Sequence, residues 1–110
     1  MSQACQRVAL CRGDEVAPGH AIRIENGALT VAVFNLDGEY FVTDDHCTHG
    51  PGSLSDGFIE GDVVECDFHN GAFNIRTGEA VVAPCMIPIK TYKALHEAGA
   101  ISIETIAIEA

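Results

Sequence analysis

Two short pairs of cysteine and histidine are the residues of this chain best suited to chemistry. Cys47 and His49 form the first pair, Cys66 and His69 form the second, and sixteen residues separate the two pairs. Thiolate sulfur and neutral imidazole both bind iron or zinc, and two of each supply four ligands. A zinc finger usually keeps its cysteines together and its histidines together, whereas each pair here mixes the two types. The arrangement favours a binuclear cluster with two cysteines on one iron and two histidines on the other.

The spacing matches the motif Cys-x-His, about sixteen residues, then Cys-x-x-His, and in this the chain resembles the Rieske iron–sulfur family. The likeness covers roughly residues 5 to 92 and extends to further positions, namely Thr48, Gly50, Leu54, Ser55, Asp56, Gly57, Gly61, Asp62, Phe73, Thr77, Gly78 and Pro84. More narrowly, the chain resembles the small Rieske ferredoxins of bacterial aromatic-ring-hydroxylating dioxygenase systems. The resemblance implies one Rieske-type 2Fe–2S cluster, with Cys47 and Cys66 on the iron that stays ferric and His49 and His69 on the iron that changes valence.

The resemblance also implies a role without catalysis. A flavoprotein ferredoxin reductase would take electrons from NAD(P)H and pass them singly to this chain, which would reduce the Rieske centre of a terminal oxygenase. Two alternatives stay open. The chain could be a Rieske-type small subunit of a reductase such as nitrite reductase, or a non-redox binding module whose four ligands hold one zinc ion.

Departures from the respiratory and photosynthetic branch of the family imply a low reduction potential. Phe68 stands where those proteins have an extra cysteine, and Gly71 and Phe73 stand where they have a serine and a tyrosine. Each missing hydroxyl is a missing hydrogen bond to the cluster sulfurs, and such bonds stabilise the reduced state. The sequence therefore predicts a potential near the lower end of the Rieske range.

Composition excludes two classes of partner. The 110 residues hold six Lys and Arg against 16 Asp and Glu, for a net charge of −10. A nucleic acid or an anionic membrane surface requires a basic surface, so neither is expected as a partner. The start of the chain lacks a signal-like segment and no apolar run has the length of a membrane span, so we expect a cytoplasmic protein. Its length predicts one domain over residues 1–110.

The acidic residues concentrate in the half that carries the two pairs. Ten of the 16 acids fall between Asp37 and Glu79, where Arg76 is the single basic residue. An ordinary solvated surface is one interpretation. The functional interpretation is an electrostatic field that steers basic partner surfaces toward the cluster.

Short runs of residues that favour β-strands must position the segments that carry the two Cys/His pairs. Branched and aromatic residues predict strands over 21–25, 29–34, 40–43, 63–66, 72–75, 87–92 and 101–106, with Asn26-Gly27 and Asp37-Gly38 as hairpin turns. Residues 44–61 read as one long functional loop, and 91–98 could instead form a helix ending at Gly99. The fold class is all-β. The resemblance implies the Rieske fold, with an antiparallel β-sandwich base and a loop-rich cluster-binding subdomain over approximately 44–84.

The remaining histidines and two aspartates are expected to have no ligand role. His46 adjoins Cys47, and adjacent residues rarely bind one metal site, so we assign it to the surface. His20 and His96 are expected to face solvent. Asp44 and Asp45 are expected on the approach to the first loop.

Five cysteines exclude a fully paired disulfide framework. Cys5 and Cys11 lie in the expected N-terminal strand region and are predicted to be inert or adventitiously oxidised rather than paired in a disulfide. Cys85 follows Pro84, near a segment that covers the cluster in the family, and it is assigned to packing.

Overall fold

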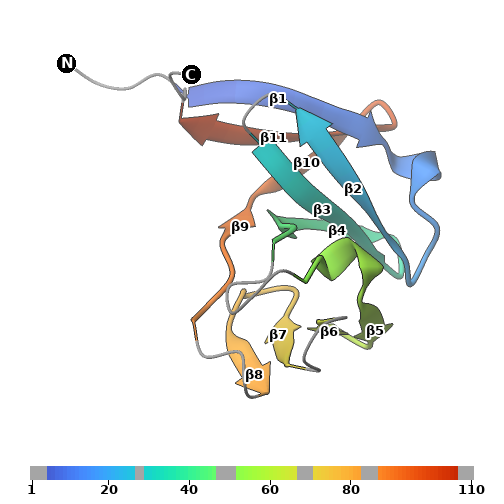
Figure 1. The fold of residues 1–110 in the computed structure, drawn as a ribbon. Coiled ribbons are helices and arrows are strands. Elements are labelled where there is room, and N and C mark those ends of the chain that lie inside the picture. The colour runs from blue at the N-terminus through green and yellow to red at the C-terminus, as the bar shows by residue number, and fades with distance from the viewer. Residues whose placement is uncertain (1–4, 27–28, 47–51, 67–70, 83–86, 107–110) are drawn as a thin grey trace.

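The structure is a computed structural model that describes residues 5–26, 29–46, 52–66, 71–82 and 87–106, and antiparallel strands dominate it (Figure 1). Within these residues the two helical segments are single 3-10 turns, η1 (Gly13–Glu15) and η2 (Leu54–Asp56). No helix in the described ranges is long and apolar enough to cross a membrane. The expected all-β class is confirmed.

Two sheets form the base of the molecule. The first has the order β1-β11-β10 and the second the order β2-β3-β4-β9. Their strands are β1 (Cys5–Arg12), β10 (Ala94–Glu97), β11 (Ala100–Ile106), β2 (Ala21–Asn26), β3 (Leu29–Leu36), β4 (Glu39–Asp44) and β9 (Thr91–Tyr92). A shared core of Val16, Val31, Val33, Val42, Ile101 and Ile103 lies between the sheets. This is the antiparallel base that the family resemblance implied.

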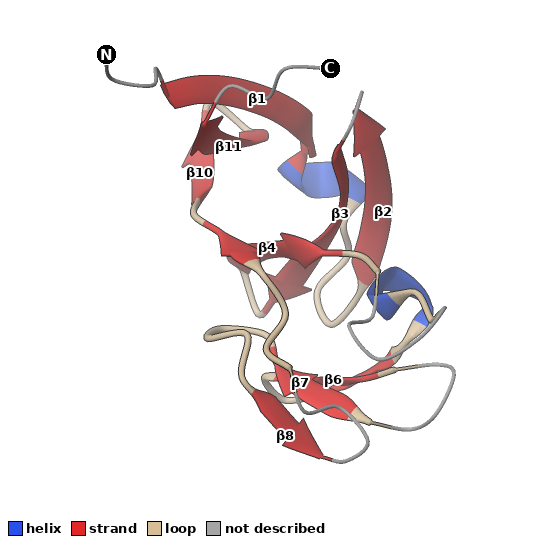
Figure 2. Cartoon of the chain, turned by 60° about the vertical axis from the view of Figure 1, so that its left-hand side comes forward, coloured by secondary structure: helices blue, strands red, loops and turns tan. Residues whose placement is uncertain are grey.

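A third sheet packs on the other face of β3. Its order is β5-β6-β7-β8, from β5 (Phe58–Glu60), β6 (Val63–Glu65), β7 (Ala72–Asn74) and β8 (Ala80–Val82). Figure 2 shows this part of the chain below the base. Its core contains Ala32, Phe34, Leu36, Leu54, Val64, Cys66, Phe73, Ile75 and Ile89. Alternate residues of β3 thus enter two different cores, which explains the apolar run over residues 31–34.

The hairpin turns follow the expected chemistry. Asp37 and Gly38 have φ of 57° and 94°, and they join Leu36 to its strand partner Glu39. Two successive residues with positive φ are the signature of a type I′ turn. Asn26 pairs with Leu29, which confirms the first predicted hairpin, although Gly27 lies outside the described residues.

The C-terminal segment is also a hairpin. Ala98 and Gly99 have φ of 53° and 80° and connect β10 to β11. The helical alternative for residues 91–98 is therefore wrong, because this segment pairs as β9 and β10 instead.

Two other expectations were partly wrong. Residues 44–61 are not one continuous loop, because they contain η2 and β5. Only Thr91–Tyr92 of the expected strand 87–92 pairs in a ladder. Pro88 carries no N–H, and the N–H of Ile89 donates to the oxygen of Gly78 at 2.8 Å, so the segment joins two sheets as an extended connector. Gly78 allows this approach, since a Cβ there would lie 2.4 Å from the Ile89 oxygen.

Candidate metal centre

Cys66 is the predicted ligand that the structure describes. It directly follows β6, its side chain is 1% exposed, and it forms no disulfide. The other three predicted ligands, Cys47, His49 and His69, lie outside the described residues. The structure therefore places one ligand directly and shows, for the others, the segments from which their loops begin and end.

The second loop is closed at its base. Glu65 at the end of β6 pairs with Ala72 at the start of β7, and the N–H of Cys66 donates to the oxygen of Gly71 at 2.6 Å. Residues 66–71 therefore form the connection between two adjacent strands. The Cys-x-x-His pair belongs entirely to this connection.

The first loop is closed at its base as well. His46 and Ser53 form an antiparallel bridge, and the N–H of Leu54 donates to the backbone oxygen of Asp45 at 2.7 Å. The Asp45 carboxylate accepts the N–H of Ser55 at 2.8 Å and the hydroxyl of Ser53. Cys47 and His49 lie in sequence between these bonded segments.

The return segment of the first loop lies against the start of the second. A Cβ built on Gly57 would lie 2.3 Å from the oxygen of Glu65, so the end of η2 meets the residue before Cys66. Leu54 and Cys66 also share one buried core with Phe73. Figure 1 shows η2 and strands β5 to β8 together, at the end of the molecule opposite β1 and β11. The bases of both loops are therefore adjacent.

These features fit a cluster that needs ligands from two loops. A free, buried thiol stands at the base of one closed loop, and the base of the other packs beside it. Two thiolates and two imidazoles are the ligand set of a Rieske 2Fe–2S cluster. Within the part of the chain that the structure describes, no group of three or more His, Cys, Asp or Glu is placed to hold a metal ion.

Asp44 and Asp45 have structural roles that the sequence analysis did not identify. The hydroxyl of Tyr92 donates to Asp44 Oδ1 at 2.6 Å, and the N–H of Asp44 donates to the oxygen of Lys90 at 2.9 Å. Burial raises the pKa of the Tyr92 hydroxyl. The hydrogen bond to Asp44 and the negative charge of the Asp44 carboxylate raise this pKa further. Partners this far along the chain leave no local pattern in the sequence.

The residues assigned no ligand role are placed as expected, where the structure describes them. His46, His20 and His96 are exposed, and the His96 ring lies 4.7 Å from the ring of Tyr40. Cys85 is outside the described residues.

Both N-terminal cysteines lie in β1, and Cys11 forms no disulfide. Burial, together with the charge of Glu15, raises the pKa of Cys11 to about 11. This thiol stays protonated at neutral pH and is a poor nucleophile.

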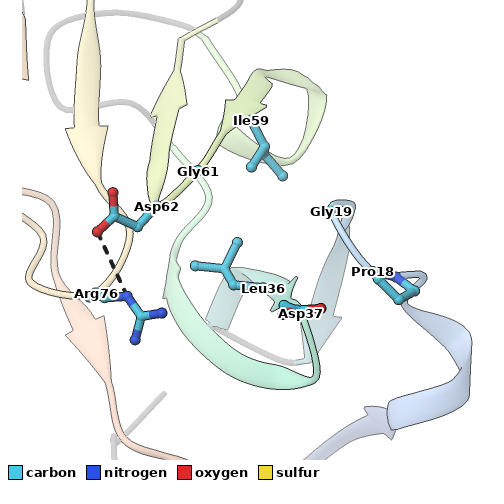
Figure 3. A pocket seen from close by; sticks show the side chains of 8 residues that line it. All are labelled: Pro18, Gly19, Leu36, Asp37, Ile59, Gly61, Asp62 and Arg76. Atoms are coloured by element: carbon cyan, nitrogen blue, oxygen red, sulfur yellow. Dashed lines mark ion pairs between the residues drawn. The ribbon is translucent and has the colours of Figure 1, made fainter.

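Arg76 connects the third sheet to the base. Its guanidinium lies 3.3 Å from Glu39 and 3.7 Å from Asp62, and its Cζ lies 4.9 Å from the centre of the Phe41 ring. It also lines an open groove of about 560 Å³ at the seam, together with Pro18, Gly19, Leu36, Asp37, Ile59, Gly61 and Asp62 (Figure 3). Cys66, the predicted ligand that the structure describes, is not among these lining residues.

Comparison with known proteins identifies the family of this chain. Residues 6–93 match the family described as the Rieske 2Fe-2S domain. The biphenyl dioxygenase ferredoxin subunit of Pseudomonas sp. (strain KKS102) is 51% identical over 83 residues, which are 74% of this chain and 76% of that protein.

Solved structures agree with this match. The ferredoxin of Sphingomonas yanoikuyae B1 is 42% identical with a TM-score of 0.87, covering 91% of this chain and 99% of that one. A ferredoxin-oxygenase complex of carbazole 1,9a-dioxygenase aligns at 34% identity and a TM-score of 0.85, over 94% and 97% of the two chains. The chain therefore belongs to the Rieske family, and its cofactor is one Rieske-type 2Fe–2S cluster.

Proposed function

We propose that this protein is the ferredoxin component of an aromatic-ring-hydroxylating dioxygenase system. It carries one electron at a time from an NAD(P)H-dependent flavoprotein reductase to a terminal Rieske oxygenase. One observation carries the proposal: the two ligand loops are each closed by hydrogen bonds at their base, and the two bases lie side by side next to Cys66. The chain that holds them is similar to a dioxygenase ferredoxin along most of its length. One of the similar structures is itself a complex of ferredoxin with oxygenase.

We assign Cys47 and Cys66 to one iron and His49 and His69 to the other. When bound, the cluster supplies a one-electron redox couple. The protein supplies the ligands and keeps them in place. Cys66 is held by its backbone hydrogen bond to Gly71 and by packing against buried apolar side chains, so its sulfur is withdrawn from water.

The same loop supports a low potential, around −150 mV at the lower end of the Rieske range. Gly71 and Phe73 are both buried, and neither carries a hydroxyl that could donate to a sulfur. The acidic residues between Asp37 and Glu79 disfavour the added negative charge of the reduced state.

The proposal extends to organisation and location. The chain is one Rieske domain over residues 1–110, whose cluster-binding subdomain spans approximately 44–84. η2 and strands β5 to β8 fall within that range. We propose a cytoplasmic carrier whose partners are the reductase and the oxygenase. The acidic composition disfavours a nucleic acid or an anionic membrane surface as a partner.

The two alternatives receive less support. A structure described as a nitrite reductase small subunit, from Mycobacterium tuberculosis, aligns with a TM-score of 0.80 over 98% of this chain and 100% of that one. Its identity is only 20%, so the likeness shows a common fold alone. A zinc-binding module is disfavoured by the match to a 2Fe-2S family over residues 6–93.

Electron transfer can be tested with the purified components of a biphenyl dioxygenase system under anaerobic conditions. NADH and the flavoprotein reductase should bleach the visible absorbance of this protein, and the oxidised terminal oxygenase should then restore it. A His46→Ala variant should behave identically, because His46 is exposed and lies outside the ligand set. A protein that dithionite bleaches but neither partner acts upon would contradict the proposed role while leaving the cluster intact.

A further inference from the structure

Asp45 is the one charged side chain that is buried among the residues the structure describes. It is 2% exposed, and it precedes the first predicted ligand, Cys47, by two residues. A buried charge is costly unless hydrogen bonds compensate for the lost water. Its surroundings should therefore explain why it is there.

Each oxygen of the Asp45 carboxylate accepts a hydrogen bond. Oδ1 accepts the N–H of Ser55 at 2.8 Å, and Oδ2 accepts the hydroxyl of Ser53. The hydroxyl oxygens of Ser53 and Ser55 lie 3.1 Å apart. Hydrogen bonds that a carboxylate accepts are among the stronger ones in proteins.

These bonds join the two ends of the first ligand loop. Asp45 precedes the loop, whereas Ser53 and Ser55 follow it. The backbone of Asp45 adds two contacts: its oxygen accepts from Leu54 N at 2.7 Å, and its N–H donates to Thr30 at 3.2 Å. The side chain and backbone of one residue thus fix both loop ends to each other and to β3.

Asp44 provides an internal comparison. It is also an aspartate beside the loop, but its hydroxyl partner is Tyr92 on β9. Lys90 lies nearby, with its ammonium 5.0 Å from the centre of the Tyr92 ring. Asp44 is more exposed than Asp45, and its described bonds do not reach the segment that returns from the loop.

We propose that Asp45 is a positioning residue for the loop that carries Cys47 and His49, and that its buried negative charge lowers the reduction potential of the cluster. The inference rests on the proposed ligand assignment. The hydrogen bonds of Asp45 slow loss of the cluster, because the two ends of the loop cannot separate without breaking the bonds from Ser53 and Ser55 to the Asp45 carboxylate. The buried anion disfavours an added electron, since the interior screens charge less than water does.

The first test compares cluster release in the holoprotein and its variants Asp45→Ala, Asp45→Asn and Asp44→Ala. An excess of an iron chelator is added, and the loss of visible absorbance is followed with time. Asp45→Ala should release its cluster at least about tenfold faster than the wild type, because the Ser55 N–H and Ser53 hydroxyl lose a charged acceptor. Asp44→Ala should stay near the wild-type rate, and Asp45→Asn should recover part of the difference, since its amide oxygen can still accept.

The second test measures the reduction potential of the cluster. A role of Asp45 that consisted only of holding the loop ends together would leave this potential unchanged. Asp45→Asn removes the charge while keeping the shape of the side chain. It should favour the reduced state about tenfold, an upward shift of about 59 mV for one electron. Asp44→Asn should change the ratio of reduced to oxidised cluster by at most about threefold, because its carboxylate is more exposed to water.

If Asp45→Ala does not fold, the Asp45→Asn variant alone tests the proposed role of Asp45. An Asp45→Asn protein with wild-type release rate and wild-type potential would overturn the inference, as would an Asp45→Ala protein that keeps its cluster as the wild type does. These results differ from failure of the proposed function, in which the wild-type protein would hold its cluster but neither the reductase nor the oxygenase would exchange electrons with it.

Discussion

Replacing Cys66 by alanine should reduce the iron content of the purified protein to below about a tenth of the wild-type value. The thiol of Cys66 is buried, forms no disulfide and stands at the base of the second loop, so its removal deletes one of four ligands at a position where water cannot substitute. The visible absorbance should disappear with the iron.

Cys11→Ala is the matched control, because Cys11 is also free of disulfide bonding but lies in β1 of the base sheet. This variant should keep the iron, the sulfide and the spectrum of the wild type. Retention of the full spectrum by Cys66→Ala, with its fold confirmed by circular dichroism, would show that Cys66 is not a ligand.

Replacing both His49 and His69 by cysteine should lower the reduction potential by about 250 mV, provided the cluster still assembles. Clusters with four thiolates, as in plant-type ferredoxins, have potentials of about −400 mV, whereas the lower end of the Rieske range is about −150 mV. Thiolate donates more negative charge than neutral imidazole, so the oxidised state is favoured. Protein-film voltammetry at one pH measures the shift.

His46→Ala serves as the control for this exchange. His46 adjoins Cys47 but is exposed, and its described backbone pairs with Ser53. Its replacement should leave the potential and the optical spectrum unchanged. The ligand assignment would be wrong if His46→Ala lost the cluster while His49→Ala kept it.

The base of the fold could be predicted because its signals are local. β3 carries a long apolar run, and its strand neighbours are joined by turns that tolerate positive φ, as at Asp37 and Gly38. Such features depend only on residues close in the chain. The C-terminal hairpin through Ala98 and Gly99 belongs to the same class, although good helix formers made its sequence ambiguous.

The third sheet was harder to predict because its strands are very short. β5 and β8 have three residues each, too few to show a period of two. Phe58, Val81 and Val82 are moreover exposed, with Phe58 at 64%, so apolar character there does not indicate burial. The connector around Ile89 was also predicted wrongly, since its backbone partner, Gly78, lies in the connection between β7 and β8 and not on a neighbouring strand.

The proposed ligand pairs stand out in the sequence, whereas the residues beside their loops that we propose to position them do not. Cysteine and histidine are rare enough that two close pairs carry information by themselves. Asp45 acts through Ser53 and Ser55, eight and ten residues later, and Gly57 acts through its fit against Glu65. Both depend on how the chain returns after the loop, and that path becomes visible only in the folded structure.

Chemical analysis of the protein as isolated tests the central claim most directly. Iron, acid-labile sulfide and zinc should be measured together, alongside the visible spectrum, in protein purified without oxygen. The ligand set predicts two irons and two sulfides per chain and a coloured protein that dithionite bleaches. One zinc per chain, with no sulfide and no visible absorbance, would contradict the account.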